Sequence, residues 1–496
     1  MPLLSISVHG YRGFAEPATL ELAVPDGRPG SGLTLLVGPN NGGKSTVLEA
    51  MQFLQRTDEA PPMTEGRRNA AAGGRVLIEY ESDKGTAALG TTGLGGDVLW
   101  RKQDLELNRG SVFVVPSRRA LDTSFGKHIT DRLTYASSQP HIPNRQSRPN
   151  FAPRLFGIQK NRQLFDETLR RIMGDAPEWY IEQMENGFNY LKFCSASSPH
   201  GSEGLGDGLI TLFYLVDALY DSEPGDIIVV DEPELSLHPT YQRRLATVIA
   251  DFSATRQVIC ATHSTYFADW NFVANGATIA RVHLVQKCST ISTLKATTAT
   301  EATKLLRDRN NPHVLGTTAR EVFFLEDGVI LLEGQEDVLD YPIVAEQLEV
   351  DIPGTFYGWG VGGVSKMGII AQILSDLGFR RVVGLLDSGG EETLKSLRKQ
   401  FPDYTFAVIP ARDIRTKKSR PARRATRGIL DAHGIVRKEY QEEMRELFQE
   451  VSLFVRTGEI RVSPPGRLSG RFDLRPARKG GGSITMSRPT KSHLTP

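Results

Sequence analysis

The stretch at residues 33–54, LTLLVGPNNGGKSTVLEAMQFL, constrains the fold more than any other part of the chain. An apolar run typical of a buried parallel strand leads into a glycine-rich turn, and apolar positions at helical spacing follow. The turn satisfies GxxxxGK[ST], in which backbone N–H groups at a helix N-terminus surround phosphate oxygens. A chance glycine-rich turn is disfavoured because the strand and the helix stand on the correct sides. The predicted ATP contacts from this loop are Gly38, Asn40, Asn41, Gly42, Gly43, Lys44, Ser45 and Thr46.

Lys44 is expected to reach the β- and γ-phosphates, and Ser45 to bind Mg²⁺. Further along, GDIIVVDEPELSLHP places Asp231 and Glu232 directly after an apolar strand, where α/β sheets bind their ligands. We expect Asp231 to hold Mg²⁺ through water and Glu232 to orient or deprotonate the water that attacks the γ-phosphate. A surface acid pair that ends a strand is the alternative.

Two more segments complete the predicted nucleotide site. RQVICATHSTYFADW delivers His263 at the end of an apolar strand, which predicts a γ-phosphate sensor, with a structural histidine as the alternative. In residues 198–223 a glycine-rich turn opens an apolar helix, and such a helix N-terminus is a second anion site. Within one subunit this second site has no obvious ligand. We therefore expect it to close over the ATP of a partner subunit in a homodimer or a higher oligomer.

The four segments occur in the order of the ABC-type ATPase heads of structural-maintenance and recombination-repair ATPases, which this chain resembles over about residues 1–285. The opening ISVHGYRGF is similar to the first strand and turn of those heads. The resemblance implies that Ser202 and Gly204 contact the γ-phosphate in trans and that a D-loop lies around 235–238. The turn GSEGL departs from the usual signature, LSGGQ or LSxGE.

Such heads usually carry a coiled coil between the phosphate loop and the signature. Residues 60–200 show no sustained heptads, so we expect a compact inserted subdomain there. Within it, Arg118 and Arg119 follow an apolar strand. They are candidates for phosphate or interface contacts, with a solvated basic pair as the alternative.

A second strand–helix alternation runs from about residue 329 to residue 410 and predicts a small parallel sheet. Glu333 and Asp387 each follow a strand and should converge on one edge of that sheet. Clustered carboxylates repel one another, and a divalent ion is their usual neutraliser. Glu336 and Asp337 could offer further oxygen ligands, or they could simply be acids of a first helical turn.

This second pattern resembles a Toprim domain over about residues 321–412, with Glu333 and Asp387 matching the metal-binding acids of that family. An ABC-type head followed by Toprim is similar to the OLD family of nucleases, which includes the Gabija nuclease subunit. That resemblance implies nucleotide-governed DNA cleavage with Mg²⁺ or Mn²⁺, and a role in phage defence. Gly389 stands where the family has a second aspartate, so either the site is a remnant or another acid replaces the lost one. The candidate substitutes are Glu391, Glu392 and Asp413.

A basic segment follows this site. Residues 411–430 contain eight basic side chains against one acid, enough for non-specific DNA binding in a chain whose 59 Lys and Arg nearly balance 58 Asp and Glu. A solvated loop is an alternative that is compatible with DNA binding. The predicted DNA contacts are Arg415, Lys417, Lys418, Arg420, Arg423 and Arg424. Residues 431–455 predict an amphipathic helix, and the Gly- and Pro-rich tail is expected to be largely disordered.

The sequence therefore predicts an α/β protein: an ABC-type P-loop ATPase domain over 1–320, a Toprim-like parallel α/β domain over 321–455 and a tail over 456–496. Three separated cysteines and the lack of a signal peptide or a membrane span favour the cytoplasm. The expected function is an ATP-controlled, metal-dependent DNA endonuclease. The alternative is an ATP-switched sensor or scaffold that binds DNA or a separate effector protein without cutting.

Overall fold

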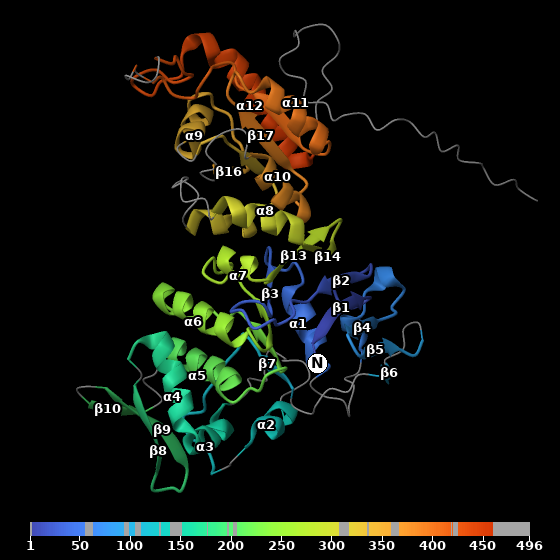
Figure 1. Ribbon diagram of the computed structural model, residues 1–496, viewed down its shortest axis with the longest axis vertical. Helices are drawn as coiled ribbons and strands as arrows, with labels where there is room; N and C mark the ends of the chain where they lie inside the picture. Colours follow the sequence, from blue (N-terminus) through green and yellow to red (C-terminus); the bar gives the residue numbers. More distant parts are fainter. Residues whose placement is uncertain are drawn as a thin grey trace, which may run out of the picture. The chain divides into compact units, whose positions relative to one another are not determined.

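The computed structural model forms two compact units, which are described separately (Figure 1). The first contains the chain up to Glu326 together with Gly368–Phe379, and most of the second half forms the other unit. The structure describes residues 2–459 except for these ranges: 55–62, 94–98, 105–110, 128–129, 139–150, 176, 196–197, 202–205, 307–316, 335–336, 359–366, 418 and 420–424.

The first unit is built on a six-stranded sheet in the order β14-β13-β3-β12-β11-β7. All neighbours pair in parallel except β14, which is antiparallel to β13 at one edge. The apolar runs of the sequence form its central strands, and β3 and β12 are buried along their whole length. The strands are β3 (Leu33–Val37), β7 (Val112–Val115), β11 (Ile227–Asp231), β12 (Gln257–Ala261), β13 (Thr278–Val285) and β14 (Cys288–Thr293).

This order brings the carboxyl ends of β3, β11 and β12 to one edge of the sheet, because parallel strands end on the same side. The phosphate loop, Asp231 and His263 follow these three strands, so the sheet itself assembles the predicted nucleotide site. Helices accompany the strands along the chain: α1 (Lys44–Gln52), α5 (Asp207–Tyr220), α6 (Pro239–Phe252), α7 (Trp270–Ala274) and α8 (Ala296–Leu306).

The expected inserted subdomain at 60–200 is not one block. Strands β4, β5 and β6 join β1 and β2 in a separate antiparallel sheet, and β7 completes the parallel sheet. The reason is strand pairing. β1 pairs with β2 along one edge and with β4 along the other, and these two strands lie before and after the phosphate loop in the sequence. The strands are β1 (Leu3–His9), β2 (Ala18–Glu21), β4 (Leu77–Ser82), β5 (Gly85–Thr91) and β6 (Leu99–Gln103).

Only the later part of that region forms a lobe of its own. Three helices precede a small antiparallel sheet of order β10-β9-β8, and α4 packs against α5 and α6 (Figure 1). An aromatic cluster fills the lobe, with the ring of Phe213 5.1 Å from Phe165 and 5.6 Å from Trp179. The elements are α2 (Arg132–Ser138), α3 (Ala152–Lys160), α4 (Arg162–Met173), β8 (Glu178–Gln183), β9 (Asn189–Ser195) and β10 (Ser198–Gly201).

The second unit has a four-stranded sheet in the order β16-β15-β17-β18, and every pair is parallel. The small parallel sheet expected from the sequence is therefore confirmed. Its strands are β15 (Val329–Leu331), β16 (Thr355–Tyr357), β17 (Val382–Leu386) and β18 (Thr405–Val408). Its helices are α9 (Asp337–Gln347), α11 (Glu391–Gln400) and α12 (Lys438–Thr457).

The amphipathic helix expected over 431–455 begins later, at Lys438, because Asp431 closes a turn by accepting the backbone N–H groups of His433 and Ile435. Its apolar face, including Phe448 and Val451, is buried in the core of the second unit. The expected disorder of the tail falls almost wholly outside the described residues.

Helix α10 (Met367–Asp376) marks a difference from the expected domain boundary. Residues 368–379 lie within the second half of the sequence but belong to the first compact unit. Asp376 accepts the backbone N–H of Lys295 at 3.2 Å, and the guanidinium of Arg281 lies 3.9 Å from the ring of Phe379. These contacts attach the segment to β13 and to the start of α8.

No helix in the described part of the chain is both long and apolar enough to cross a membrane. Cys194, Cys260 and Cys288 are free thiols, as their wide separation in the sequence suggests.

Candidate nucleotide and nuclease sites

The phosphate loop is shaped by close approach to β13. A side chain at Gly38 or Gly42 would place its Cβ 2.4 Å or 2.3 Å from the carbonyl oxygen of Val282, which only glycine avoids. Gly38 and Gly43 also have φ of +122° and +115°, in the region that favours glycine. The glycines of the motif are thus required both by backbone conformation and by packing.

Lys44 and Ser45 stand at the start of α1, opposite Asp231 at the end of β11. The Lys44 ammonium donates to the carbonyl oxygens of Gly38 and Pro39 at 2.9 and 3.0 Å. The Ser45 hydroxyl donates to the Asp231 carboxylate at 3.0 Å. The Ser45 hydroxyl and the Asp231 carboxylate are neighbouring oxygen ligands of the kind that Mg²⁺ prefers. The residues present therefore fit the expected ion.

The acids of β11 lie in a poorly solvated position. Burial, followed by repulsion from Glu232, raises the pKa of Asp231 to about 6. Burial also lowers the pKa of the Lys44 ammonium, against the attraction of Asp231 and Glu232. These mutual effects indicate that the lysine and both acids surround the same small volume. A cation bound there would hold Asp231 in its ionised form.

His263 follows β12 on the same edge. Burial, followed by the Lys44 charge, lowers the pKa of its imidazole, while Glu232 acts in the opposite direction. The histidine is therefore in electrostatic reach of both the phosphate-loop lysine and the predicted base. The sensor role expected for His263 stays a prediction.

Glu234 is a site residue that the sequence reasoning missed. Its carboxylate accepts the His263 backbone N–H at 2.6 Å and the Thr262 hydroxyl at 2.8 Å. It thereby ties the loop after β11 to the loop after β12. The signal was present in the run DEPE, where the second glutamate lies three residues after the first acid.

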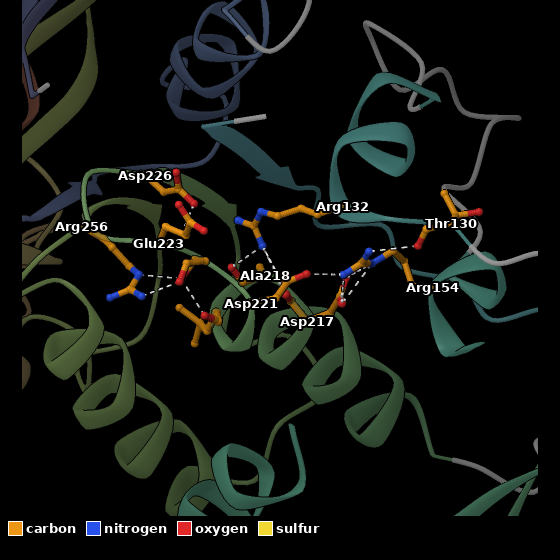
Figure 2. Close-up of polar contacts among 11 residues, drawn as sticks. Thr130, Arg132, Arg154, Asp217, Ala218, Asp221, Glu223, Asp226 and Arg256 are labelled. Carbon is orange, nitrogen blue, oxygen red and sulfur yellow. Dashed lines mark hydrogen bonds and ion pairs between the residues drawn. The ribbon is translucent and has the colours of Figure 1, made fainter. Parts of the chain in front are cut away.

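Ser202 and Gly204, the predicted signature contacts, lie outside the described residues. The helix that follows them, α5, is held at its C-terminal end by buried ion pairs (Figure 2). Arg154 on α3 donates through Nε and Nη2 to Asp217 at 2.9 to 3.1 Å, and through Nη2 to Asp221 at 2.6 Å. Arg132 on α2 binds Asp221 at 2.6 Å. Side chains of α2 and α3 thus bind the C-terminal end of α5 directly.

In the second unit, Glu333 and Asp387 meet at the carboxyl edge of the parallel sheet. The Glu333 carboxylate accepts the backbone N–H of Asp387 at 2.8 Å, and the Asp337 carboxylate accepts that of Gly334, also at 2.8 Å. Burial raises the pKa of Asp387 to about 8, and repulsion from Glu333, Asp413 and Asp337 adds to the effect. Four carboxylates from three segments of the chain therefore influence the pKa of Asp387 or of one another.

These acids suit a hard divalent ion by their chemistry, since all supply oxygen. Among the described residues, however, no group of three or more His, Cys, Asp or Glu side chains has the spacing that holds a metal ion. One reason is visible at Asp413, whose carboxylate is ion-paired with Lys417 and accepts the backbone N–H of Arg415. For Asp413 to bind a metal ion, the Lys417 ammonium would have to move away from the Asp413 carboxylate.

The structure distinguishes among the acids considered as replacements at Gly389. Glu391 and Glu392 lie exposed in the first turn of α11, whereas Asp413 is buried and raises the pKa of Asp387. Gly389 itself has φ of +131°, and its neighbourhood would leave a Cβ in open space. Glu336 lies outside the described residues.

Two of the residues predicted to contact DNA form ion pairs within the second unit. Arg415 pairs with Asp340 at 3.1 Å, and Lys417 pairs with Asp413. The other four lie outside the described residues: Lys418, Arg420, Arg423 and Arg424.

Comparisons with known proteins agree with the first unit's geometry. Residues 5–186 match a family model described as an AAA domain, and residues 137–269 match another AAA domain model whose description also names the AbiEii toxin of a type IV toxin–antitoxin system. The chain is 26% identical over 390 residues to a curated "OLD nuclease" of Thermus scotoductus, covering 64% of this chain and 71% of that protein.

Two solved structures show a partial overlap. The SMC head domain from Thermotoga maritima is 15% identical with a TM-score of 0.35, over 60% of this chain and 100% of that one. An Smc head domain from a complex derived from Pyrococcus furiosus is 12% identical with a TM-score of 0.39, over 62% of this chain and 99% of that one. The phosphate-loop geometry and the two AAA domain matches agree on an ATPase domain in the first unit, and the chain is similar to the curated OLD nuclease.

Proposed function

We propose that this chain is an ATP-controlled, metal-dependent DNA endonuclease. The observation that carries the nuclease half is the meeting of Glu333 and Asp387 at the carboxyl edge of the second sheet, with the Asp387 N–H 2.8 Å from the Glu333 carboxylate. The relative from Thermus scotoductus, named as an OLD nuclease, supports the same class of activity. A role in defence against phage is part of this proposal and rests on similarity of family.

For ATP hydrolysis, the phosphate loop and Lys44 bind the phosphates, and Ser45 and Asp231 hold Mg²⁺. Glu232 accepts the proton of the attacking water, and His263 contacts the γ-phosphate. Mg²⁺ would neutralise charge on the phosphate oxygens. The signature residues Ser202 and Gly204 would complete the site from a second copy of the chain, so the active form is a homodimer through the ATPase units.

For DNA cleavage, Glu333, Asp337, Asp387 and Asp413 form the acidic pocket of the second unit. A divalent ion there would polarise the scissile phosphate. Lys417 releases Asp413 and becomes available to the DNA backbone, in line with the basic composition of residues 411–430. In this proposal Asp413 supplies the carboxylate that Gly389 lacks.

Supercoiled plasmid tests the nuclease half. We expect the wild-type chain to nick the plasmid with Mg²⁺ or Mn²⁺, and Asp387→Ala and Asp413→Asn to lower the rate at least about 100-fold, because each removes an ion ligand. Glu391→Ala is the matched control, since Glu391 is an exposed acid of α11, and it should nick at the wild-type rate. Cleavage that survives in Asp387→Ala, or its absence under every metal and nucleotide condition, would refute the nuclease.

The second candidate function is an ATP-switched sensor or scaffold that binds DNA or a separate effector without cutting. Gly389 and the Lys417–Asp413 pair favour it, because together they leave the acidic site one free carboxylate short. A chain that hydrolyses ATP and binds DNA yet never cuts would establish this function in place of the first.

A further inference from the structure

Arg119 lies in the loop after β7, the parallel neighbour of β11. Its Nη2 donates hydrogen bonds to the backbone carbonyl oxygens of Asp231 and Glu232, at 2.7 and 3.2 Å. Two other nitrogens of the guanidinium, Nε and Nη1, are buried. Of the roles that the sequence left open for this arginine, the solvated one is therefore wrong.

The Arg119 guanidinium is a buried charge that lies against the backbone of Asp231 and Glu232. Burial lowers its pKa to about 10, against the attraction of Asp231 and Glu234, so it stays charged at neutral pH. Nε and Nη1 find no hydrogen-bond partner among the described residues. Buried donors left unpaired carry an uncompensated desolvation cost. An apolar side chain would fill the space without that cost, which argues for a role other than packing.

The peptide that Arg119 holds is a strained one. Glu232 has φ of +50°, a left-handed conformation that is unfavourable for an L-residue. Its N–H donates to the carbonyl oxygen of Ala261 at 2.9 Å, and its carbonyl oxygen accepts from Arg119 and from the N–H of Leu235. This φ sets the direction in which the Glu232 carboxylate leaves the backbone. The hydrogen bonds around it must therefore outweigh the strain.

We propose that Arg119 is a positioning residue for ATP hydrolysis: it holds the Asp231–Glu232 peptide so that the Glu232 carboxylate faces the attacking water. The inference rests on the role proposed above for Glu232. Arg119 acts through the backbone of that residue and does not itself contact the phosphates. Its removal should therefore slow the hydrolytic step and leave nucleotide affinity nearly unchanged.

Steady-state ATP hydrolysis by the full-length chain tests this, with Arg119→Met compared with Arg170→Met. Arg170 is an exposed arginine of α4 in the same unit, which makes it the matched control. Because misplacement of about 1 Å can cost 100-fold, we expect Arg119→Met to lower kcat about 10- to 100-fold with KM within about twofold. Arg170→Met should match the wild type. If Arg119→Met fails to fold, Arg119→Lys and Arg170→Lys carry the same comparison.

A double variant separates positioning from a general structural role. In a Glu232→Gln background, measured by single-turnover hydrolysis, Arg119→Met should cause less than about a twofold further loss, because the group it positions is already disabled. A folded Arg119→Met with the kcat of Arg170→Met, or losses that multiply in the double variant, would overturn the inference. Full hydrolysis by Glu232→Gln alone would instead overturn the proposed role of Glu232, whatever the arginine variants do.

Discussion

The proposed chemistry of this chain depends on individual carboxylates, and burial shifts the pKa values of several of them. Asp387 is the clearest example, since burial and three acidic neighbours raise its pKa to about 8. An unfolded aspartate titrates near 4. Between those two values the folded state binds a proton that the unfolded state releases, so the free energy of unfolding falls as the pH rises from about 4 to 8.

Asp387→Asn removes this titration. In EDTA we expect the variant to melt above the wild type at pH 8.5, by about 2–4 °C for each kcal/mol gained, and to lose that advantage at pH 5. Thermal melts of both chains across this range provide the measurement. Asp376→Asn is the control: Asp376 belongs to the first unit, where it accepts the backbone N–H of Lys295, so any pH effect common to both variants is unrelated to the acidic site. An advantage of equal size at both pH values would contradict the assigned cause.

At the same scale, the sequence pointed to Glu333, Asp387, Asp231 and His263 because each lies at or just after the end of an apolar strand, and to Lys44 because it belongs to the phosphate-loop motif. The sequence alone did not favour Asp413 over Glu391 as a substitute for the carboxylate missing at Gly389. That choice depends on which of the two side chains the fold buries beside Asp387. Glu234 was missed for a similar reason: its partners, Thr262 and His263, come from a different strand.

Among the elements, α5 is held by a buried ion pair. The pair Arg154–Asp217 at its C-terminal end is almost fully buried, with side-chain exposures of 2% and 1%. Burial raises the pKa of Asp217 to about 6, against the attraction of Arg154, so the pair is ionised at neutral pH. A partner lost from such a pair leaves a buried charge uncompensated.

We therefore expect Arg154→Met to destabilise the chain by about 3–5 kcal/mol. Arg171→Met removes a half-exposed pair with Asp251 from the neighbouring helix α4 and should cost less than about 1 kcal/mol. Urea unfolding of both variants gives the values. Arg154→Met combined with Asp217→Leu should recover part of the loss, because the unpaired charge is gone. Equal losses in Arg154→Met and Arg171→Met would show that burial of the pair does not matter.

Element positions were largely predictable where apolar runs were continuous, as in β3, β11, β12 and β17. The division of residues 60–200 was not, because strand pairing across the phosphate loop leaves no local signal. Leu77–Ser82 alternates buried and exposed residues whether it pairs with β1 or with strands of an insertion.

For the whole molecule, one chain combines a nucleotide site and an acidic site in two compact units. The order of motifs predicted both units and their parallel sheets. It did not predict that residues 368–379 belong to the first unit, since an apolar helix can be buried in either unit. The proposed control of cleavage by ATP would need both units, so it is tested with the full-length chain.

Plasmid cleavage with ATP and Mg²⁺ by two variants tests this claim most directly. Lys44→Ala should not hold ATP, whereas Glu232→Gln should bind ATP and not hydrolyse it. The two therefore fix opposite nucleotide states of an otherwise identical nuclease site. We predict cleavage rates that differ at least about fivefold between them, as expected for a coupling free energy of about 1 kcal/mol or more. Equal rates in the two variants, with Asp387→Ala inactive, would contradict control by ATP.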